Sequence, residues 1–429
     1  MIVSILEKTD TPQMAHGNYL KQPFSGLPCH LDANSQQLWH HFVHAGSATM
    51  SCHKQMQNQT CRVLLPMAFE APALCHAIIY FSAAYKAAQI EDQGQRDILI
   101  RHAASLRTAS LSYLRQDILS VESRRPEPIF ATCLMLCLSA LCHDNKDYST
   151  WRTHLLGARA MLPLVHDVTT SASDPDSSTI FLQRRYDLLE TIASLTFSGL
   201  QPLVLNDRPL DKIPQPTQVK FDDYCGCYTD VLGILRHIGA ISWGSWEQEH
   251  EVAGSAALPE ADYELEAVQL EAKVLAMIER DSDTRPTFDL AFQNTFDEKQ
   301  TLEFAYCNLL CEYAALIHIR TQMRGLESDS ADVQHPVKMI ISIAQQLEPP
   351  SGLSPVLGIN TALFLAGRHA LHTDRTAIRQ LILCLYNKIH SQNLVHTLRI
   401  LDYFWEQFDS RENYNEVQQI MPVRDFIAW

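Results

Sequence analysis

Three histidines lie close together near the beginning of the chain, at positions 40, 41 and 44. His40 and His44 are four residues apart, a spacing at which two imidazoles on one helix face can bind a metal ion. The segment lacks the glutamate that accompanies such a pair in zinc hydrolases. Apolar residues at Leu38, Phe42 and Val43 predict a helix with an inward stripe, which the histidines would flank. We therefore interpret all three as surface histidines.

Cys225 and Cys227 are separated by a single glycine. Thiolates are preferred zinc ligands, but a structural zinc ion takes four of them. The sequence shows no second pair at ligand spacing, so these two cysteines supply half of a site at most. We predict that the protein holds no structural zinc and no other metal.

Residues 221–224, FDDY, place two neighbouring aspartates after an aromatic residue, as in the metal-binding carboxylate motifs of prenyl cyclases. The third carboxylate and a matching motif on another helix are missing. The positive end of a helix dipole also favours aspartates. We expect a helix to begin at Cys225, which gives these two aspartates a structural role.

Motifs that carry common enzyme chemistry are missing from the sequence. It has no P-loop, no GxGxxG and no GxSxG. We assign no catalytic, cofactor-binding, metal-binding or DNA-binding residue, expect no cofactor, and predict that the protein is not an enzyme. The alternative is a cyclase-like enzyme on the same helical scaffold, which would act through the shape of a buried pocket and would need no such motif.

The stretch that organises the remaining elements is a helix hairpin over residues 130–162. Residues 130–142 are apolar on every face and too short to cross a bilayer, so they predict a helix buried in a large helical core. Residues 143–147 form a polar turn. A second helix, capped by Ser149 or Thr150, then repeats apolar residues at helical spacing, namely Trp151, Leu155, Ala158 and Leu162.

Helical periods recur along the rest of the chain, whereas period-two alternation does not. The fold class is therefore all-α, a single large multi-helix domain of packed helical hairpins. We divide the chain into an extended leader (1–33), a helical domain (34–410) and a C-terminal tail (411–429). Besides the hairpin, helices are expected from Asn34 (capped by Asn34 or Ser35), at 71–85 with Pro72 in first position, at 97–121 and 181–199, from 225, and at 260–280, 301–324, 336–347, 359–369, 375–390 and 394–408.

The chain is acidic, with a net charge of −15. Proteins that bind nucleic acid by themselves need clustered Lys and Arg to neutralise phosphates. The densest basic pieces are the pairs within residues 123–126 and 183–186. We therefore expect no autonomous binding to nucleic acid.

No segment has the length and apolar character of a membrane span, and the N-terminus lacks the basic and apolar regions of a signal peptide. Most of the twelve cysteines lie in apolar helical runs, as expected for reduced thiols that act as small hydrophobes. These features predict a soluble intracellular protein that does not contact a membrane.

Four segments together resemble the fungal-specific transcription factor domain, the helical regulatory region that usually follows a binuclear zinc cluster in fungal regulators. Their order and spacing over about residues 35–410 carry the resemblance. The segments are 64–79 (LLPMAFEAPALCHAII) with 82–84, 150–159 (TWRTHLLGAR), 223–227 (DYCGC) with Leu232 and Leu235, and 360–368 (NTALFLAGR) continued by 398–405 (LRILDYFW).

The zinc cluster itself is missing from these residues. Such a cluster needs six cysteines with two CxxC pairs, because two zinc ions share thiolates. Cys29, Cys52 and Cys61 stand alone and no CxxC occurs. The family's DNA-binding residues therefore have no counterparts here.

The resemblance implies a nuclear transcriptional regulator, present also in the cytoplasm, that lacks its own DNA-binding finger. It resembles the finger-less members that accompany fungal secondary-metabolite gene clusters and would act through a protein partner that is a DNA-binding regulator. Two alternatives stay open, namely the cyclase-like enzyme and a gene whose zinc-finger exon lies upstream of Met1. The identity of any small-molecule effector is unknown.

Overall fold

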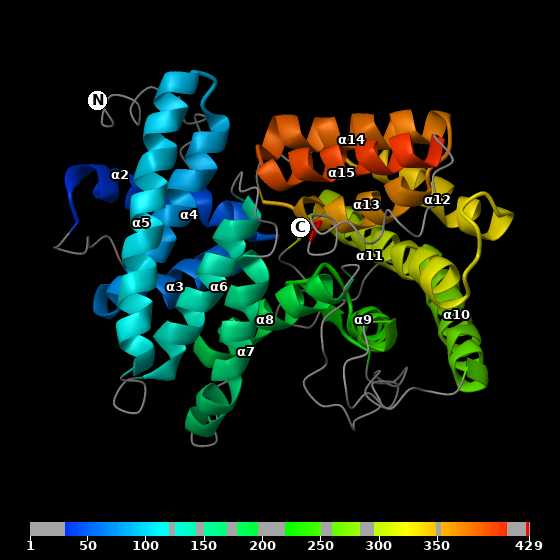
Figure 1. The fold of residues 1–429 in the computed structure, drawn as a ribbon, viewed down its shortest axis with the longest axis horizontal. Helices are drawn as coiled ribbons and strands as arrows, with labels where there is room; N and C mark the ends of the chain where they lie inside the picture. Colours follow the sequence, from blue (N-terminus) through cyan, green and yellow to red (C-terminus); the bar gives the residue numbers. More distant parts are fainter. Residues whose placement is uncertain are drawn as a thin grey trace. The chain divides into compact units, whose positions relative to one another are not determined.

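A computed structural model describes residues 31–119, 125–142, 150–169, 178–195, 219–249, 260–283, 296–348, 353–409 and 426–428. Within these ranges the protein is all-α, as the sequence predicts (Figure 1). Helices α2 to α15 follow one another along the chain, and the only strands in the described ranges are two of two residues each. None of the described helices is long and apolar enough to span a membrane. Most of the predicted leader and tail lies outside the described residues.

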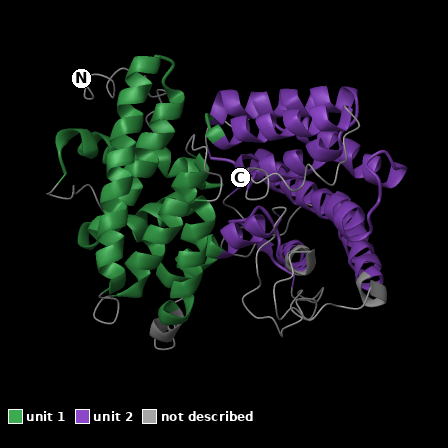
Figure 2. Ribbon diagram, in the orientation of Figure 1, with its two compact units in different colours: residues 1–146, 150–186, 390–392 green, residues 147–149, 187–389, 393–429 purple. Residues whose placement is uncertain are grey.

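The chain forms two compact units (Figure 2). Unit 1 comprises residues 1–146, 150–186 and 390–392, and unit 2 comprises residues 147–149, 187–389 and 393–429. The division falls within α8 (Ser178–Ser194). Each unit is described by itself below.

Unit 1 is built from helix hairpins, as predicted. Helix α4 packs against both α5 and α6, and α6 packs against α7. Its elements are α2 (Ala33–His41), the π-helical turn η1 (Phe42–Gly46), the 3-10 turn η2 (Ala48–Met50), α3 (Lys54–Glu70), α4 (Pro72–Gln89), α5 (Gln93–Leu119), α6 (Pro126–Cys142), α7 (Thr150–Thr169) and the first part of α8.

Helix α6 is the most deeply buried element of unit 1, which confirms the prediction for residues 130–142. Nearly all of its side chains are buried, because the helix has no polar face to turn toward solvent. Gly157 of α7 faces α6, and a Cβ there would be in ordinary van der Waals contact with the Cys133 sulfur, at 3.6 Å. The predicted turn at 143–147 lies outside the described residues.

Helix α2 starts two or three residues earlier than the sequence predicts. Asp32 is the N-cap, and its carboxylate accepts a hydrogen bond of 2.7 Å from the Ser35 backbone N–H. Asn34 and Ser35, the predicted caps, lie inside the helix. Aspartate serves this purpose as well as asparagine or serine, so residue type alone could not choose among the three.

The sequence predicts no helix over residues 54–70, where the structure has α3 with Pro66 inside it. Proline removes one backbone hydrogen bond, and here the helix continues through it to Glu70. The N-terminus of α3 is capped by the side chain of His53. Pro72 occupies the first turn of α4 as predicted.

Unit 2 is arranged around α11, which packs against α9, α10, α12 and α13. Residues 426–428 also belong to this core, since the ring of Phe426 lies 5.2 Å from that of Phe364. The elements are β1 (Phe221–Asp222), β2 (Cys227–Tyr228), α9 (Thr229–Glu249), α10 (Glu260–Ser282), α11 (Glu298–His318), η6 (Ile319–Met323), α12 (Ala331–Ala344), η7 (Pro355–Gly358), α13 (Asn360–His369), α14 (Thr373–Ile389) and α15 (Gln392–Asp409).

Two predicted helix starts in unit 2 are wrong. Residues 225–227 belong to a β-hairpin, and α9 begins only at Thr229. Helix α12 begins at Ala331, five residues before the predicted start at Pro336. Its cap is Ser330, whose side chain accepts a hydrogen bond from the Val333 backbone N–H. Pro336 lies inside α12, as Pro66 lies inside α3.

Gly239→Ala is expected to destabilise unit 2 strongly. A Cβ at Gly239 of α9 would lie 2.1 Å from the Cβ and 2.8 Å from the backbone oxygen of Ser194 in α8, so the two helices would have to move apart. Overpacking of this kind costs about 3 kcal/mol of the free energy of unfolding. Urea denaturation measures the difference. Gly358→Ala is the control, because a Cβ there meets nothing within 4 Å, and equal stability of both variants would contradict this contact.

Candidate functional site

The histidines at 40, 41 and 44 do not form a common site. His40 and His44 are exposed, which confirms their interpretation as surface residues. His41 is different, because its Nδ1 lies 2.7 Å from the Ser82 hydroxyl. That hydroxyl donates its proton to the Leu38 carbonyl, so Nδ1 of His41 must be the donor to Ser82. Burial, together with the nearby charges of Lys86 and His44, lowers the pKa of His41 to about 4, and the ring is neutral.

The β-hairpin of unit 2 contains the two aspartates and the two cysteines that the sequence singled out. Strand β1 pairs antiparallel with β2, with Asp222 opposite Cys227. The Asp222 carboxylate accepts the backbone N–H groups of Tyr224 and Cys225 at 2.9 and 3.1 Å. Gly226 has a φ of +70°, which glycine adopts without strain. Asp222 therefore stabilises a turn and does not cap a helix.

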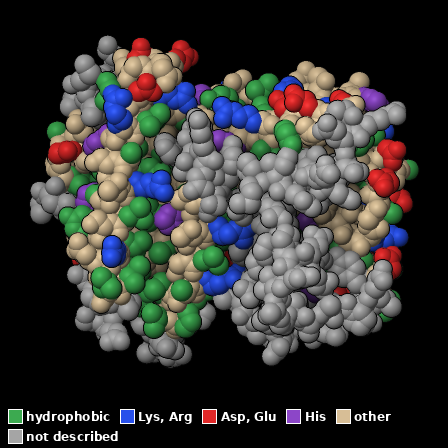
Figure 3. Space-filling view, viewed as in Figure 1, with side chains coloured by type: hydrophobic (Ala, Val, Ile, Leu, Met, Phe, Trp, Pro, Cys, Tyr) green, Lys and Arg blue, Asp and Glu red, His purple; other side chains and the backbone are tan. Residues whose placement is uncertain are grey.

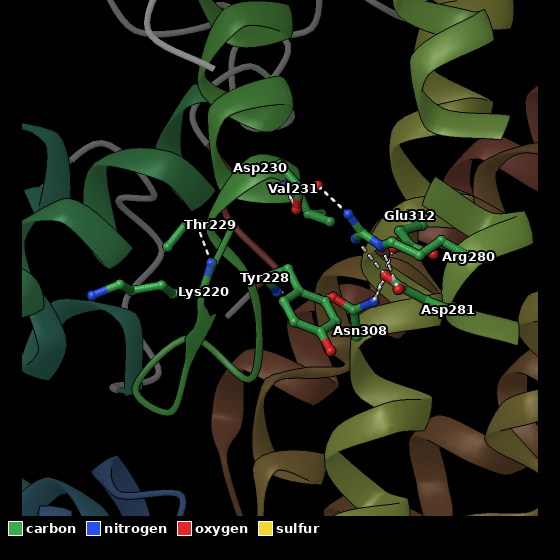
Figure 4. A network of polar contacts seen from close by, with 9 residues as sticks. All are labelled: Lys220, Tyr228, Thr229, Asp230, Val231, Arg280, Asp281, Asn308 and Glu312. Atoms are coloured by element: carbon green, nitrogen blue, oxygen red, sulfur yellow. Dashed lines mark hydrogen bonds and ion pairs between the residues drawn. The ribbon is translucent and has the colours of Figure 1, made fainter. Parts of the chain in front are cut away.

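A buried polar network joins this hairpin to three helices (Figure 4). We call it the α9–α11 network; it consists of Tyr228, Asp230, Arg280, Asp281, Asn308 and Glu312. Arg280 of α10 donates to Asp230 of α9 at 2.7 Å and forms two parallel bonds of 2.6 and 2.7 Å with Asp281. Its guanidinium also lies 4.9 Å from the centre of the Tyr228 ring. The paired bonds orient the guanidinium within α10, and its bond to Asp230 ties α10 to α9.

Asn308 of α11 is the centre of the network. Its side-chain oxygen accepts the Tyr228 backbone N–H at 2.9 Å, which holds the hairpin on α11. Its amide group donates to Asp281 and Glu312, both at 2.9 Å. The Asn308 side chain thus accepts one hydrogen bond and donates two, as a buried amide requires if its polar atoms are not to be left without partners.

Glu312 is fully buried and protonated at neutral pH. Burial, helped by its contact with Asp281, raises its pKa to about 10. Burial opposes the charge of Asp281 as well, but hydrogen bonds from Arg280 and Glu312 outweigh it and hold the pKa of Asp281 below its usual value. Glu312 thus donates its proton to the Asp281 carboxylate. An acid that stays protonated to pH 10 suits a structural hydrogen bond better than proton transfer near neutrality.

The structure brings together two cysteine pairs that are distant in sequence. We call Cys225, Cys227, Cys307 and Cys311 the cysteine cluster. The last two lie one turn apart on α11, on either side of Asn308. A Cβ on Gly226 would lie 3.9 Å from the Cys307 Cβ, and the Cys227 thiol is hydrogen-bonded to that of Cys311. Cys225 and Cys227 are neighbours in the sequence, whereas their partners Cys307 and Cys311 come from a helix about 80 residues later, so sequence spacing does not connect the two pairs.

The cysteine cluster is not arranged for metal binding. Among the described residues, no three His, Cys, Asp or Glu side chains are placed to hold a metal ion together. The chemistry available to the cluster is that of thiols, which can share a proton and which an oxidant can join in a disulfide.

Comparison with known proteins identifies the family. No curated protein and no solved structure matches the chain. The family model described as the fungal specific transcription factor domain matches residues 37–425, a range that contains the α9–α11 network and the cysteine cluster. This range is most of the chain, and it includes the four segments on which the sequence resemblance rests. The chain therefore belongs to the family of the fungal specific transcription factor domain.

Proposed function

We propose that this protein regulates transcription of a secondary-metabolite biosynthetic gene cluster through a partner that binds DNA. The observation that carries the proposal is the family match over residues 37–425, which makes the chain a transcriptional regulator. The zinc cluster of this family needs two CxxC pairs, and the sequence contains none. DNA recognition is therefore assigned to the partner.

The net charge of the chain supports the proposal that the partner, and not this protein, binds DNA. With a net charge of −15, the protein is repelled by DNA phosphates unless a local basic surface overcomes the repulsion. On the described part of the face in Figure 3, Lys and Arg side chains stand singly or in small groups among neutral, acidic and hydrophobic ones. A DNA-reading surface requires a denser basic stripe.

Helix α10 offers a surface on which a partner helix could dock. Leu265, Val268 and Leu275 are 58%, 45% and 44% exposed and follow the three- and seven-residue spacing of a helix-packing seam. We call them the α10 stripe. Exposed Glu264 and Glu279 lie near its ends. A basic amphipathic helix of a DNA-binding regulator fits such an apolar stripe with acidic flanks.

The partner also accounts for nuclear entry. The sequence contains no Lys- or Arg-rich run of the kind that serves as a nuclear localisation signal. We propose that the protein is nuclear when it is bound to its partner and cytoplasmic when it is not.

We expect deletion of the gene to lower transcripts of the regulated cluster, while the pure protein binds the cluster promoters no more tightly than unrelated DNA at physiological salt. Transcript profiling and a promoter-binding assay measure the two effects. In cells, Leu265→Glu with Leu275→Glu is expected to reproduce the transcript loss, since the charges disrupt the α10 stripe. The matched control is Leu383→Glu, at a residue 42% exposed on α14 of the same unit.

Three outcomes would contradict the proposal. Tight, sequence-specific binding by the protein alone would refute the need for a partner. A Cys-rich exon upstream in the genomic DNA, joined to this chain in the transcript, would assign DNA binding to the protein itself. Unchanged transcripts together with loss of the metabolite would favour the cyclase-like enzyme instead.

A further inference from the structure

Contacts that do not involve sulfur also hold the two parts of the cysteine cluster together. The Tyr228 backbone N–H donates to Asn308, and Cys227 and Cys307 are the chain neighbours of these two residues. Gly226, between the two hairpin cysteines, faces the Cys307 side of α11. Cys227 is 1% exposed, whereas Cys311 is partly exposed. Cys311 is thus the less buried residue of the hydrogen-bonded pair.

From this arrangement we propose that Cys227 and Cys311 form a reversible disulfide when the protein meets a hydroperoxide. The inference concerns the chemistry of these two residues and does not depend on the proposed partner. The hairpin that carries Cys227 is bound to α11 through Asn308, and the two thiols are close enough to share a hydrogen bond. A disulfide, with an S–S bond of about 2.05 Å, would draw them closer still.

The hydrogen bond also makes one of the thiols more reactive. The S–H of Cys227 donates to Cys311, and this bond lowers the pKa of Cys311 despite the opposing effect of burial. The same bond, together with burial, raises the pKa of Cys227 well above its usual value. Burial alone raises the pKa of Cys133 in α6 to about 12. Since the thiolate is the nucleophile, Cys311 is the expected site of attack.

Oxidation proceeds in two balanced steps. The Cys311 thiolate attacks one oxygen of the hydroperoxide, the O–O bond breaks, and the leaving oxygen takes a proton to give water or an alcohol. Cys311 is then a sulfenic acid. The Cys227 sulfur attacks the Cys311 sulfur, the S–O bond breaks, and water leaves with the Cys227 proton. The two cysteines lose two electrons and the hydroperoxide gains them. A dithiol reverses the reaction by exchange.

The disulfide would fix the hairpin to α11 covalently. It would close a loop of about 80 residues and restrict the unfolded chain, so the melting temperature of unit 2 should rise by roughly 5 °C. The hairpin leads directly into α9, so oxidation would tie α9 more firmly to the α9–α11 network.

Peptide mapping of the full chain tests the proposal. The protein is treated with hydrogen peroxide, free thiols are alkylated, and tryptic peptides are analysed by mass spectrometry. We expect two of the twelve thiols to be lost and residues 221–236 to be linked to residues 300–320, with fragmentation placing the bond between Cys227 and Cys311. Treatment with a dithiol should restore both thiols.

Serine variants identify the sulfurs independently. Cys227→Ser and Cys311→Ser should each abolish the cross-link, whereas Cys225→Ser and Cys307→Ser should keep it. Cys133→Ser, in the buried Cys133 and Cys137 pair of α6, is the matched control and should also keep it. The proposal is overturned if the folded wild-type protein loses no thiols at peroxide concentrations that oxidise a free peptide thiol. A bond between any other pair of cysteines would overturn it as well.

Discussion

Leu136→Asp is expected to unfold unit 1. Leu136 is 1% exposed in the middle of α6, and its chain neighbours from Ile129 to Leu138 are buried too. A carboxylate there would be buried away from water among apolar side chains, and it would leave a packing defect in place of the leucine. The expected loss exceeds about 4 kcal/mol, against a total stability of about 5 to 15 kcal/mol for a typical protein.

Circular dichroism and size-exclusion chromatography at 25 °C measure the outcome. The matched control is Leu156→Asp in α7, because Leu156 is 43% exposed and its replacement leaves the charge in water. The control should stay folded and soluble. A folded, monodisperse Leu136→Asp protein would show that α6 does not support the core as described.

Glu312→Gln is expected to stabilise unit 2 above neutral pH. The unfolded chain releases the Glu312 proton near pH 4.5, but the folded protein keeps it to about pH 10. The unfolded state therefore gains stability as the pH rises between these values. Glutamine cannot ionise, and its side chain can still donate to Asp281 and accept from Asn308. At pH 8 the gain in the free energy of unfolding should be on the order of 2 kcal/mol.

Urea denaturation of both proteins at pH 5 and pH 8 measures this effect. The difference between variant and wild type should be small at pH 5 and largest at pH 8. Glu279→Gln, at an exposed position of the same helix that carries Arg280, is the control and should leave the pH dependence unchanged. A Glu312→Gln protein that is less stable than wild type at pH 8 would mean that the buried carboxyl is ionised.

Most helices of this protein could be read from the sequence, since their apolar period is carried by many residues. Helix α6 is the clearest case, because a long run without a polar face is typical of a helix buried on all sides. Prolines caused the main errors. Pro66 and Pro336 lie inside helices whose tertiary packing outweighs the loss of one backbone bond. Pro72, in contrast, marks a helix start as expected.

The candidate site was harder to predict because its parts are distant in sequence. Asp222 and Gly226 were visible signals for a tight turn, and they should have argued against a helix at Cys225. The partners of that turn could not be inferred in the same way. Asn308 and Cys311 look like ordinary members of a buried helix, and only the tertiary fold places them beside Tyr228 and Cys227.

The contacts of the α9–α11 network join residues that are made at different times on the ribosome. The hairpins of unit 1 join helices that are neighbours in the chain, so they can fold soon after they emerge. The bond between Tyr228 and Asn308 spans 80 residues, and that between Asp230 and Arg280 spans 50. Until α11 has left the ribosome, Cys225 and Cys227 lack the contacts with α11 that cover them in the folded protein. Nascent chains therefore pass through a period in which these two thiols depend on the reducing power of the cell for protection.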